Sequence, residues 1–592
     1  MKKNDIRLAK EVQKWFLESV TFNDGPYTID LEQAMAVADT SKNTIVAARA
    51  GSGKTRTIVA KIVYLVAKCG IKPNEIMTFV FNSNAAKEIN MRLGQMKVNG
   101  EIVIENAKIA STFHAFSRKV VYDWCGGKEK CKEILAEDKE EFLYQVVKQL
   151  MMDSKWRRKI KSFLSGGEAN EVTEGLWQQP DYVETELRRL AKMMTQFVNR
   201  AQQKYLGSGV SLNSNVEQYL LNSEIEERER LFIEIGTECY DRYHQNLLCK
   251  KKSVPNVFSK YGTDFNLIVS WAAKLIKNRR GLTKDRLRNK KYLLIDEYQD
   301  FSQLFLYAVF AIRSVAKDAN LFVVGDDLQA INRFAGSEVE YFKNFEQFFG
   351  GDSSRLTIST NYRCGYEIVD MAHKFMKKAM KEKGSFKAFS HKAGEVVVVN
   401  LSNIDVGYAM VDYDKRVSNE DKTYGQIARK MLGHSPKIMT LKYLKVLIEI
   451  IRQNNGAEDI LVLHRNNEMN EEGIGLVELK SGLREAMRGF GVVEDDEFER
   501  KVKVMTMHKS KGLEAEVVII LEADEGVIPK EHPDTELFSV FGETTEIALA
   551  DQKRLFYVAM TRAKKKLYII YNGLTRKSFL KYLGRGIKQW EE

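Results

Sequence analysis

The segment that most constrains the fold lies near the N-terminus and joins an apolar run, a glycine-rich loop and a helical pattern. The apolar run is Thr44–Ala47, the loop is Ala48–Thr55 (ARAGSGKT), and the helical pattern is Ile58–Val66. A strand that enters a helix through such a loop turns several backbone N–H groups toward one point, where a phosphate can bind. The segment therefore predicts a parallel α/β sheet with a phosphate-binding loop.

The residue types within this loop fit that chemistry. Gly51 and Gly53 allow the tight turn, Lys54 would reach the β- and γ-phosphates, and the Thr55 hydroxyl would hold Mg²⁺. Ala48 stands where the strict pattern has glycine, so the strand before the loop and the helix after it carry the interpretation. The alternative is a glycine-rich turn that arose by chance.

Two sets of short, β-rich apolar runs predict two α/β lobes with parallel sheets, because such runs are typical of strands buried on both faces. The first set is 44–48, 76–81, 108–113, 292–296 and 321–325, and the second is 356–360, 396–401, 459–464, 503–507, 516–521 and 566–571.

Polar amphipathic helical patterns, such as Glu184–Lys204, fill the interval between the first-lobe runs and predict an all-α insertion in the first lobe. The expected parts are the N-terminal and C-terminal portions of the first lobe, the helical insertion, and a second lobe with a short irregular insertion near 403–436. Their expected bounds are 1–119 and 262–350 for the first lobe, 120–261 for the insertion, and 351–592 for the second lobe.

The 592 residues carry a formal net charge of +12, which favours a polyanionic partner. Three basic stretches fall in one region between the first-lobe motifs: 155–159, 250–252 and 277–280. We expect this region to contact nucleic acid, although charge runs of this kind are also common on solvated surfaces.

The chain carries no apolar run near the length of about 18 residues that a membrane span needs, and its N-terminus has no apolar signal region. We therefore expect a cytoplasmic protein with no membrane partner. The six cysteines are scattered, which favours buried thiols over a metal site or a disulfide framework.

Two further segments follow strand-like runs and carry candidate site residues. Asp296 and Glu297 come directly after the apolar run 292–295, where one carboxylate can bind Mg²⁺ and its neighbour can polarise an attacking water. Gln329 and Phe334 lie in a loop after the next run, so one loop would sense the γ-phosphate and offer a stacking face to a base. Without its neighbouring residues, Phe334 would be interpreted as an ordinary core aromatic.

With these segments in view, the chain resembles the UvrD/Rep/PcrA type of superfamily 1 DNA helicases, and is most similar to the helicase IV branch. The resemblance covers most of the chain and rests on motifs in the family's order. They are the glutamine segment 31–33, the Walker A loop, VFNSNAAKEI (80–89), STFHAF (111–116), the Walker B segment DEYQD (296–300), GDDLQAINRFAGS (325–337), STNYRC (359–364), MTMHKSKGLE (505–514) and RLFYVAMTRA (554–563).

The resemblance implies an ATP site shared by both lobes. Arg363 and Arg562 would stabilise transition-state charge, while Tyr362 and Arg56 would sandwich the adenine. Gln33 would hydrogen-bond the adenine edge, although Asp30 and Gln33 also fit a helix capping box. The catalytic set is Lys54, Asp296, Glu297, Gln329, Arg363 and Arg562, and the nucleotide-binding set is Gln33, Ala50, Gly51, Ser52, Gly53, Lys54, Thr55, Arg56, Tyr362 and Glu514, with Thr55 and Asp296 on Mg²⁺.

The resemblance also places Phe81, His114, Phe334, Thr506 and His508 at DNA-facing positions. Several residues depart from the family pattern: Asn84 stands for a lysine, Asn332 for an aromatic residue and Ala335 for an arginine. Only residues 469–504 separate the second-lobe segment LVLHRNNE (461–468) from the motif 505–514. The large second-lobe insertion of UvrD and Rep, which would occupy that interval, is therefore expected to be absent or vestigial.

The resemblance implies an ATP- and Mg²⁺-dependent 3′–5′ DNA helicase that moves along single-stranded DNA and acts at DNA junctions in DNA repair, recombination or replication. The alternative is a DNA-stimulated ATPase that serves as sensor or motor subunit of a nuclease-containing complex, for example in phage defence, with the nuclease or a repair protein as a separate partner. A plain P-loop kinase does not explain the second-lobe motifs.

Overall fold

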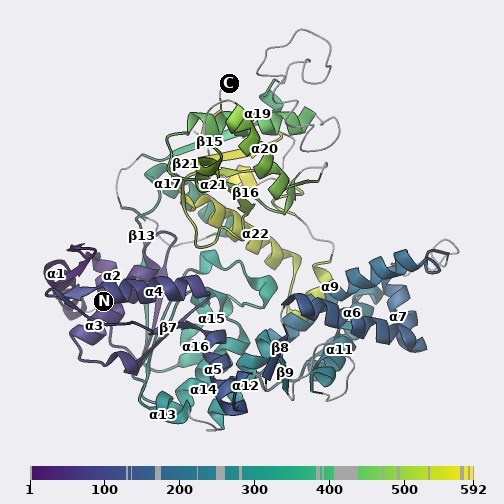
Figure 1. Ribbon diagram of the computed structural model, residues 1–592, viewed down its shortest axis with the longest axis horizontal. Helices are drawn as coiled ribbons and strands as arrows, with labels where there is room; N and C mark the ends of the chain where they lie inside the picture. The colour runs from purple at the N-terminus through teal and green to yellow at the C-terminus, as the bar shows by residue number, and fades with distance from the viewer. Residues whose placement is uncertain are drawn as a thin grey trace. The chain divides into compact units, whose positions relative to one another are not determined.

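The computed structural model divides the chain into two compact units, whose arrangement relative to one another is not determined (Figure 1). The first unit comprises Met1–Ala48, Lys54–Ile358 and Pro533–Thr545, and the second comprises Arg49–Gly53, Ser359–His532 and Glu546–Glu592. The structure describes residues 3–128, 131–134, 136–166, 175–222, 224–248, 261–278, 283–381, 387–389, 393–405, 438–469, 473–489, 494–530, 534–573, 579–584 and 587–590. The expected insertion near 403–436 lies almost wholly outside these residues, as do 250–252, 279 and 280 of the basic stretches.

The first unit is built on a six-stranded sheet in the order β12-β3-β11-β10-β4-β7, and every neighbouring pair of strands is parallel. The strands are β3 (Asn43–Ala48), β4 (Ile76–Val80), β7 (Ala110–Thr112), β10 (Tyr292–Ile295), β11 (Asn320–Gly325) and β12 (Ser353–Ile358). The five apolar runs predicted for this lobe are therefore confirmed as strands of one sheet.

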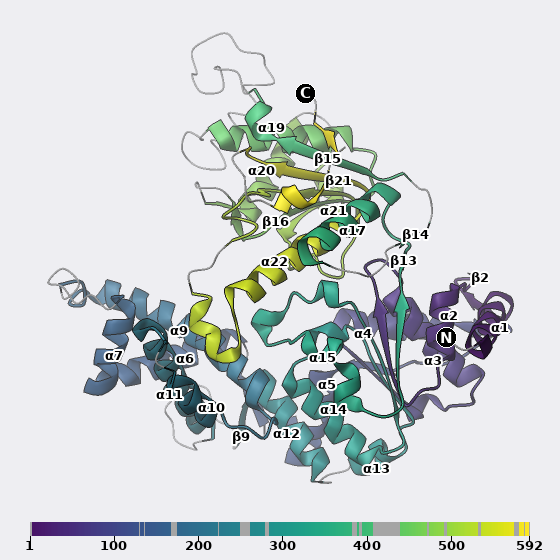
Figure 2. The ribbon, with the colours of Figure 1, turned by 180° about the vertical axis from the view of Figure 1, so that it is seen from behind.

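Side chains on alternate positions of these strands enter two separate cores. Along β3, Val46 packs into one core and Ile45 into the other, as the two-residue period of a strand requires. Figure 2 shows the helices of the two cores on opposite faces of the sheet. On one face lie α2 (Leu31–Ala38), α3 (Lys54–Ala67) and α4 (Ser83–Gln95), and on the other lie α5 (Phe113–Cys125), α12 (Phe265–Lys277) and α14 (Gln303–Val315).

Smaller elements complete the first unit. Next to α1 (Lys3–Ser19) is a four-stranded sheet in the order β2-β1-β5-β6, made of β1 (Val20–Phe22), β2 (Gly25–Pro26), β5 (Lys97–Val98) and β6 (Glu101–Ile102). The remaining short helices are α13 (Thr283–Arg288), α15 (Glu340–Lys343) and α16 (Phe345–Phe349).

The prediction that Leu356–Thr360 is a second-lobe strand is wrong. The strand there is β12, which pairs in parallel with β3 at the edge of the first sheet, with Thr357 opposite Ala47. Of its six residues only Ile358 is buried, because an edge strand has a neighbour on one side alone. An apolar run predicts a strand but not the sheet that the strand joins.

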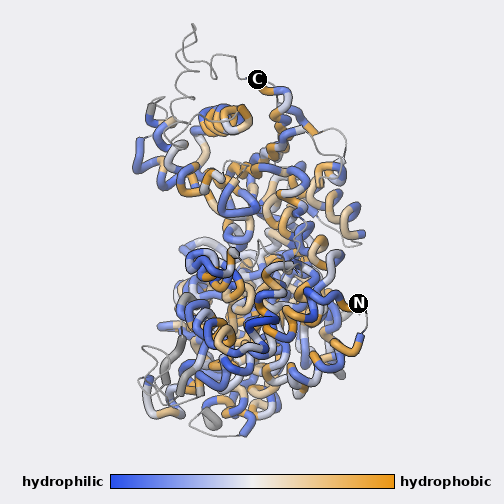
Figure 3. The backbone as a smooth tube through the Cα atoms, turned by 90° about the vertical axis from the view of Figure 1, so that its right-hand side faces the viewer, coloured by the Kyte–Doolittle hydropathy of each residue, from blue (hydrophilic) through white to orange (hydrophobic). Residues whose placement is uncertain are grey.

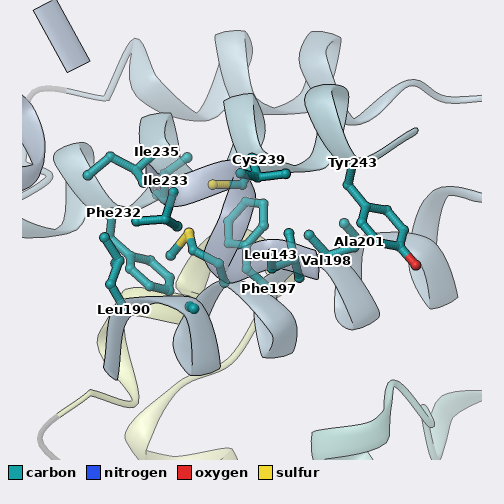
Figure 4. Close-up of a cluster of buried hydrophobic side chains, with 14 of the residues drawn as sticks. Leu143, Leu190, Phe197, Val198, Ala201, Phe232, Ile233, Ile235, Cys239 and Tyr243 are labelled. Atoms are coloured by element: carbon teal, nitrogen blue, oxygen red, sulfur yellow. The ribbon is translucent and has the colours of Figure 1, made fainter. Parts of the chain in front are cut away.

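The predicted helical insertion consists mainly of α6 (Ala136–Met152), α7 (Ser154–Leu164), α9 (Pro180–Tyr205), α10 (Leu212–Leu220) and α11 (Glu227–Leu248). At its base, β8 (Cys131–Ile134) pairs in parallel with β9 (Tyr261–Asp264). The helices enclose one apolar core that includes Phe197, Phe232 and Tyr243 (Figure 4).

One buried carboxylate joins three helices of the insertion to the start of α12. Lys139 Nζ of α6 lies 2.9 Å from Asp264 Oδ2 and also donates to Gln202 Oε1 of α9 at 2.8 Å. The hydroxyl of Tyr243, on α11, donates to the same Asp264 oxygen at 2.8 Å, and Asp264 Oδ1 accepts the backbone N–H of Leu267 at 2.8 Å. Burial alone would raise the pKa of Asp264, but Lys139 and these donors outweigh it and hold the pKa below its usual value.

The second unit is built on another six-stranded parallel sheet, in the order β19-β16-β20-β21-β15-β22. Its strands are β15 (Glu395–Asn400), β16 (Ile460–His464), β19 (Val502–Thr506), β20 (Ala515–Ile520), β21 (Ala563–Tyr571) and β22 (Lys588–Gln589). Its helices are α17 (Tyr366–Met380), α19 (Ile438–Gln453), α20 (Leu476–Gly489), α21 (Asp495–Lys501) and α22 (Thr545–Met560). The pairs β13 (Thr360–Asn361) with β14 (Lys387–Ala388), and β17 (Glu468–Met469) with β18 (Ile474–Gly475), are short.

Figure 3 shows hydrophilic and hydrophobic residues interspersed along the chain. Within the described part of the chain, no helix combines the length and the apolar character that crossing a membrane requires. The cysteine prediction holds in part, because Cys239 and Cys364 are buried, whereas Cys69 is exposed and Cys125 is half-buried.

The Lys139→Met substitution tests the buried carboxylate. It leaves Asp264 buried without its cation, so we expect the helices around it to lose about 3–5 kcal/mol of local stability. Amide hydrogen exchange in α6, α9, α11 and α12 measures this, and adding Asp264→Asn is expected to recover part of the loss. Lys97→Met is the control, because Lys97 pairs with a largely exposed Asp24. Such a surface ion pair contributes less than about 1 kcal/mol to stability. Equal effects of the two lysine substitutions would contradict the role given to Lys139.

Candidate nucleotide and DNA site

The predicted catalytic residues of the first unit follow neighbouring strands of its sheet. The phosphate-binding loop follows β3, Asp326 follows β11, and Asp296 follows β10, and these three strands lie side by side. Because the carboxyl ends of parallel strands share one edge, the sheet brings the three segments together.

Lys54 and Glu297 form an ion pair at this edge. Lys54 Nζ, at the start of α3, lies 3.0 Å from Glu297 Oε2. Burial lowers the pKa of Lys54, but the carboxylates of Glu297, Asp326 and Asp296 outweigh burial and raise it above its usual value. Lys54 is therefore held as a cation in the first turn of the helix, directly before the half-buried Thr55.

Gln299 links this pair to the next strand, a contact that sequence reasoning missed. Its side-chain N–H donates to Glu297 Oε2, and its carbonyl oxygen accepts the backbone N–H of Asp326 at 2.8 Å. Gln329 in turn donates to Asp326 Oδ2 at 2.7 Å. A Cβ at Gly325 would lie 2.5 Å from Gln299 Oε1, so glycine is needed there. The chain of contacts Lys54–Glu297–Gln299–Asp326–Gln329 joins the three loops.

Gln33 and Arg56 have partners near the same loop. Gln33 is buried and forms a capping box with Asp30, in which its side-chain oxygen accepts the backbone N–H of Asp30 at 3.1 Å. The capping interpretation of Gln33 is thus confirmed, and its adenine contact stays a prediction. Arg56 lies 4.4 Å above the ring of Tyr27 and donates to the backbone of Thr28, an arrangement that positions its planar guanidinium.

A small cavity in the first unit is lined both by Asp296 and Glu297 and by Phe81 and His114. Phe81 follows β4, and His114 lies at the start of α5 just after β7. Burial, and then the nearby Arg118, lower the pKa of His114 to about 3, so its imidazole is neutral at physiological pH. Two predicted DNA-facing residues, Phe81 and His114, therefore share one cavity with two predicted hydrolytic residues, Asp296 and Glu297.

Phe265, which the sequence reasoning missed, stacks on His114. It follows Asp264 at the start of α12 and is 52% exposed. Phe334 lies in the short helical turn Arg333–Ala335 and is 56% exposed. The interpretation of Phe334 as a core aromatic is therefore wrong.

The segment Arg49–Gly53 of the phosphate-binding loop, which includes Ala50 and Ser52, packs with residues that follow Ser359 in the second unit. The carbonyl of Gly51 accepts the backbone N–H of Tyr362 at 2.9 Å. Gly51 has φ +69, and a Cβ there would lie 2.6 Å from Asn361 Oδ1, so both its backbone conformation and its surroundings require glycine.

Arg363 and Glu514 of the second unit form an ion pair, with Arg363 Nε 2.7 Å from Glu514 Oε2. Glu514 also pairs with Lys564 at 3.1 Å. Burial would raise the pKa of Glu514, but Arg363 and Lys564 outweigh it and lower the pKa. The structure thus brings Glu514, of the predicted nucleotide-binding set, next to Arg363, one of the two arginines predicted to stabilise transition-state charge.

Arg562, the second predicted finger, is the largest fully buried side chain in the described part of the chain. Its Nε donates to the carbonyl of Val558 at 2.9 Å and its Nη1 to that of Leu513 at 3.1 Å. These acceptors fix the guanidinium between the end of α22 and the start of β20.

The other second-unit candidates lie near strand ends. Tyr362 is 40% exposed, and its ring centroid lies 4.6 Å from that of Phe389. Thr506 is the buried last residue of β19, and His508 follows it. Burial, Arg465 and Lys511 lower the pKa of His508 to about 4.

Two parallel sheets, a phosphate-binding loop after one strand and acidic residues after its neighbours define a P-loop nucleotide hydrolase with two α/β lobes. Residues 29–350 match the model of the UvrD/REP helicase N-terminal domain, and residues 465–573 match that of the UvrD-like helicase C-terminal domain. The chain belongs to the UvrD/REP helicase family and is an ATP-dependent DNA helicase.

Curated relatives are similar over most of this chain. DNA helicase IV of Escherichia coli is 24% identical over 93% of this chain and 69% of its own length. A probable DNA helicase II homologue of Mycoplasma capricolum is 23% identical over 91% of this chain and 84% of its own length. The ATP-dependent DNA helicase Rep of Buchnera aphidicola is 21% identical over 92% of this chain and 93% of its own length.

The Glu297→Gln substitution removes the carboxylate at the centre of the first-unit network while keeping its shape. We expect ATP turnover to fall by about 10²–10⁴-fold, the contribution typical of a positioned acid or base. Lys54→Ala should abolish turnover, because it removes the cation that is predicted to reach the phosphates. Single-stranded DNA binding, measured by fluorescence anisotropy, should persist in both. Glu340→Gln, a surface carboxylate of the same unit, is the control and should keep wild-type turnover. Loss of DNA binding by a folded Glu297→Gln protein would contradict this prediction.

The Arg363→Ala and Arg562→Ala substitutions test the second unit. A finger acts mainly on charge that develops in the transition state, so ATP turnover should fall by about 10³–10⁵-fold while nucleotide affinity changes far less. Steady-state ATPase assays and nucleotide titrations separate the two quantities. Arg452→Ala, which removes a surface cation of α19, is the matched control. If either finger variant kept wild-type turnover, that arginine would not take part in hydrolysis.

Proposed function

We propose that this helicase translocates 3′–5′ along single-stranded DNA and unwinds DNA at junctions, in DNA repair, recombination or replication. The observation that carries the proposal is the cavity lined by Phe81 and His114 together with Asp296 and Glu297. A DNA strand that contacts Phe81 and His114 would be displaced by a rearrangement of Asp296 and Glu297, which line the same cavity. That proximity favours a motor that exchanges its hold on DNA with each nucleotide turnover.

Mg²⁺ fits the carboxylates at the sheet edge. Burial, and then the neighbouring Glu297 carboxylate, raise the pKa of Asp296 to about 7 although Lys54 lowers it, so a further cation would stabilise the negative charge there. We propose Asp296 and Thr55 as its ligands. When bound, Mg²⁺ would neutralise phosphate charge, and Glu297 would then orient and polarise the attacking water.

The nucleotide roles implied by the resemblance complete the proposed ATP site. Tyr362 and Arg56 offer flat surfaces for an adenine, and both keep the partners described above. Glu514 would hold the ribose, and Gln329 would report the γ-phosphate through Asp326. Arg363 and Arg562 would supply positive charge in the transition state.

Exposed aromatic rings are the proposed DNA contacts of the first unit. Phe81 and Phe334 are 47% and 56% exposed, and Phe265 adds a third exposed ring next to His114. Stacking of a base on such a ring contributes about 1–3 kcal/mol and does not depend on sequence. Thr506 and His508 would contribute the second unit's contacts.

Helix α7 of the insertion is the proposed phosphate contact. It begins at Ser154 and exposes Lys155, Arg157 and Arg158, three residues of a basic stretch identified in the sequence. Such contacts release counterions, so they would make DNA affinity depend on salt.

Unwinding assays on duplexes with a 3′ tail, a 5′ tail or no tail test the proposal, together with the ATPase rate with and without single-stranded DNA. We expect unwinding of the 3′-tailed duplex and a DNA-stimulated ATPase. Strong stimulation with no unwinding of any duplex would favour the alternative, a motor or sensor subunit of a nuclease-containing complex. Unwinding of the 5′-tailed duplex alone would contradict the proposed polarity.

The Phe334→Ala substitution should uncouple hydrolysis from movement, because Phe334 and Gln329 lie in one short loop. We expect ATP hydrolysis to survive better than translocation, timed by a fluorophore at the DNA end. Phe310→Ala, an exposed phenylalanine of α14 in the same unit, is the control. A Phe334→Ala protein that hydrolyses and translocates in the wild-type ratio would refute a role for this ring in movement.

A further inference from the structure

A segment of the chain leaves the second unit, docks on the insertion of the first unit, and returns. Strand β20 lies in the second unit and so does almost all of α22, yet residues 533–545 between them belong to the first unit. The described part of this excursion, Asp534–Thr544, is called the docked segment below. It contains one helical turn of 3₁₀ type, Glu536–Phe541.

The docked segment supplies part of the insertion's apolar core. Its buried side chains are Leu537, Phe538, Val540 and Phe541, all within the core cluster of the helical insertion. The ring of Phe541 lies 4.9 Å from that of Phe197 on α9, and the ring of Phe538 lies 5.1 Å from that of Phe232 on α11. Figure 4 shows the yellow ribbon of the segment beside this cluster. Burial of a large apolar side chain contributes about 1.5–3 kcal/mol on the transfer scale. The four buried side chains therefore hold the segment on the insertion, whereas a connecting loop would need no such burial.

Polar contacts hold both ends of the docked segment. At its start, Asp534 Oδ1 accepts from Arg228 Nη2 at 3.0 Å, and at its end Glu543 pairs with the nearly buried Arg200 of α9. Between them, Lys204 Nζ donates to the carbonyl of Phe541 at 2.8 Å, and the hydroxyls of Tyr219 and Ser539 lie 2.7 Å apart. The segment is therefore fixed in position and register.

The end of the docked segment also touches the loop that carries Phe334. Arg333 Nη2 donates to the carbonyl of Gly542 at 3.0 Å. The same loop packs on the end of α9, where a Cβ at Gly336 would lie 2.4 Å from Gln203 Cβ. Arg200, Gln203 and Lys204 of α9 thus hold the docked segment on one side and the Phe334 loop on the other.

We propose that the docked segment is a tether that couples α22 to the Phe334 loop, with Arg200 and Glu543 as positioning residues. Helix α22 leads directly into Arg562, so a displacement of α22 during the nucleotide cycle would pull on Glu543 and Gly542 and shift the loop. The proposal rests on the function proposed above, in which Phe334 contacts DNA. It adds a second link between nucleotide and base, separate from the one through Gln329.

Lengthening the tether tests it without removing any of the docking side chains named above. Four glycines inserted between Thr544 and Thr545 add up to about 13 Å of slack. The control is the same insertion between Asn99 and Gly100, a hairpin turn of the first unit where a Cβ would meet nothing within 4 Å. The measured quantity is the stimulation of ATP turnover by single-stranded oligothymidylate.

We expect the slackened protein to keep its DNA-free turnover and its oligothymidylate affinity within about twofold. Its stimulation by DNA should fall at least about fivefold, the lower end of usual coupling between two sites. The control insertion should keep wild-type stimulation.

A charge exchange gives an independent measurement. Glu543→Arg alone should reduce the stimulation, and Arg200→Glu together with Glu543→Arg should restore at least half of it. A purely structural contact would change thermal stability but not the ratio of stimulated to basal turnover. Wild-type stimulation in both the slackened protein and Glu543→Arg would overturn the tether alone. A wild-type protein that DNA does not stimulate would overturn the proposed function together with the tether.

Discussion

The direction of the strands in the first sheet is the constraint on which the candidate site depends. All neighbouring pairs are parallel, so every strand ends at the same edge. Read across the sheet, β3, β11, β10, β4 and β7 are followed by the phosphate-binding loop, Asp326, Asp296, Phe81 and His114. Residues far apart in the chain become neighbours because each sits one or two positions beyond a strand end. The same geometry places the predicted DNA-facing residues of the edge beside the predicted hydrolytic residues.

Gathering these loops concentrates charge, and the structure shows how the charge is distributed. Asp296, Glu297 and Asp326 all act on Lys54 and keep it protonated despite burial, whereas Asp296 itself becomes harder to ionise. Gln299 carries no charge, and it can therefore bridge Glu297 and Asp326 without adding to their repulsion. Because Gln299 is hydrogen-bonded both to the Glu297 carboxylate and to the backbone of Asp326, a shift of one of these two residues would shift the other. The network is suited to a site whose charge changes with each ATP.

Much of this was predictable from the sequence. Runs such as 292–296 and 516–521 indicate buried strands by composition alone, and the residues after them follow from the parallel topology. Three features were not predictable. The residues of β12 do not show that it pairs with β3 of the first sheet. Phe265 stacks on His114, which lies far earlier in the chain, and the docked segment is a short apolar run with no period. Each depends on a long-range contact that no local pattern records.

The boundaries between the two units carry a further consequence. The chain passes from one unit to the other at Ala48–Arg49, Gly53–Lys54 and Ile358–Ser359. The first two crossings lie inside the phosphate-binding loop, and the third lies at the start of the STNYRC segment. The loop is therefore covalently continuous with both units, because Arg49–Gly53 pack within the second unit while the residues on either side pack within the first. The proposed phosphate binding by this loop would for that reason draw on residues of both units. The excursion at 533–545 extends the same principle to the insertion, because it gives the second unit's chain a fixed point in the first.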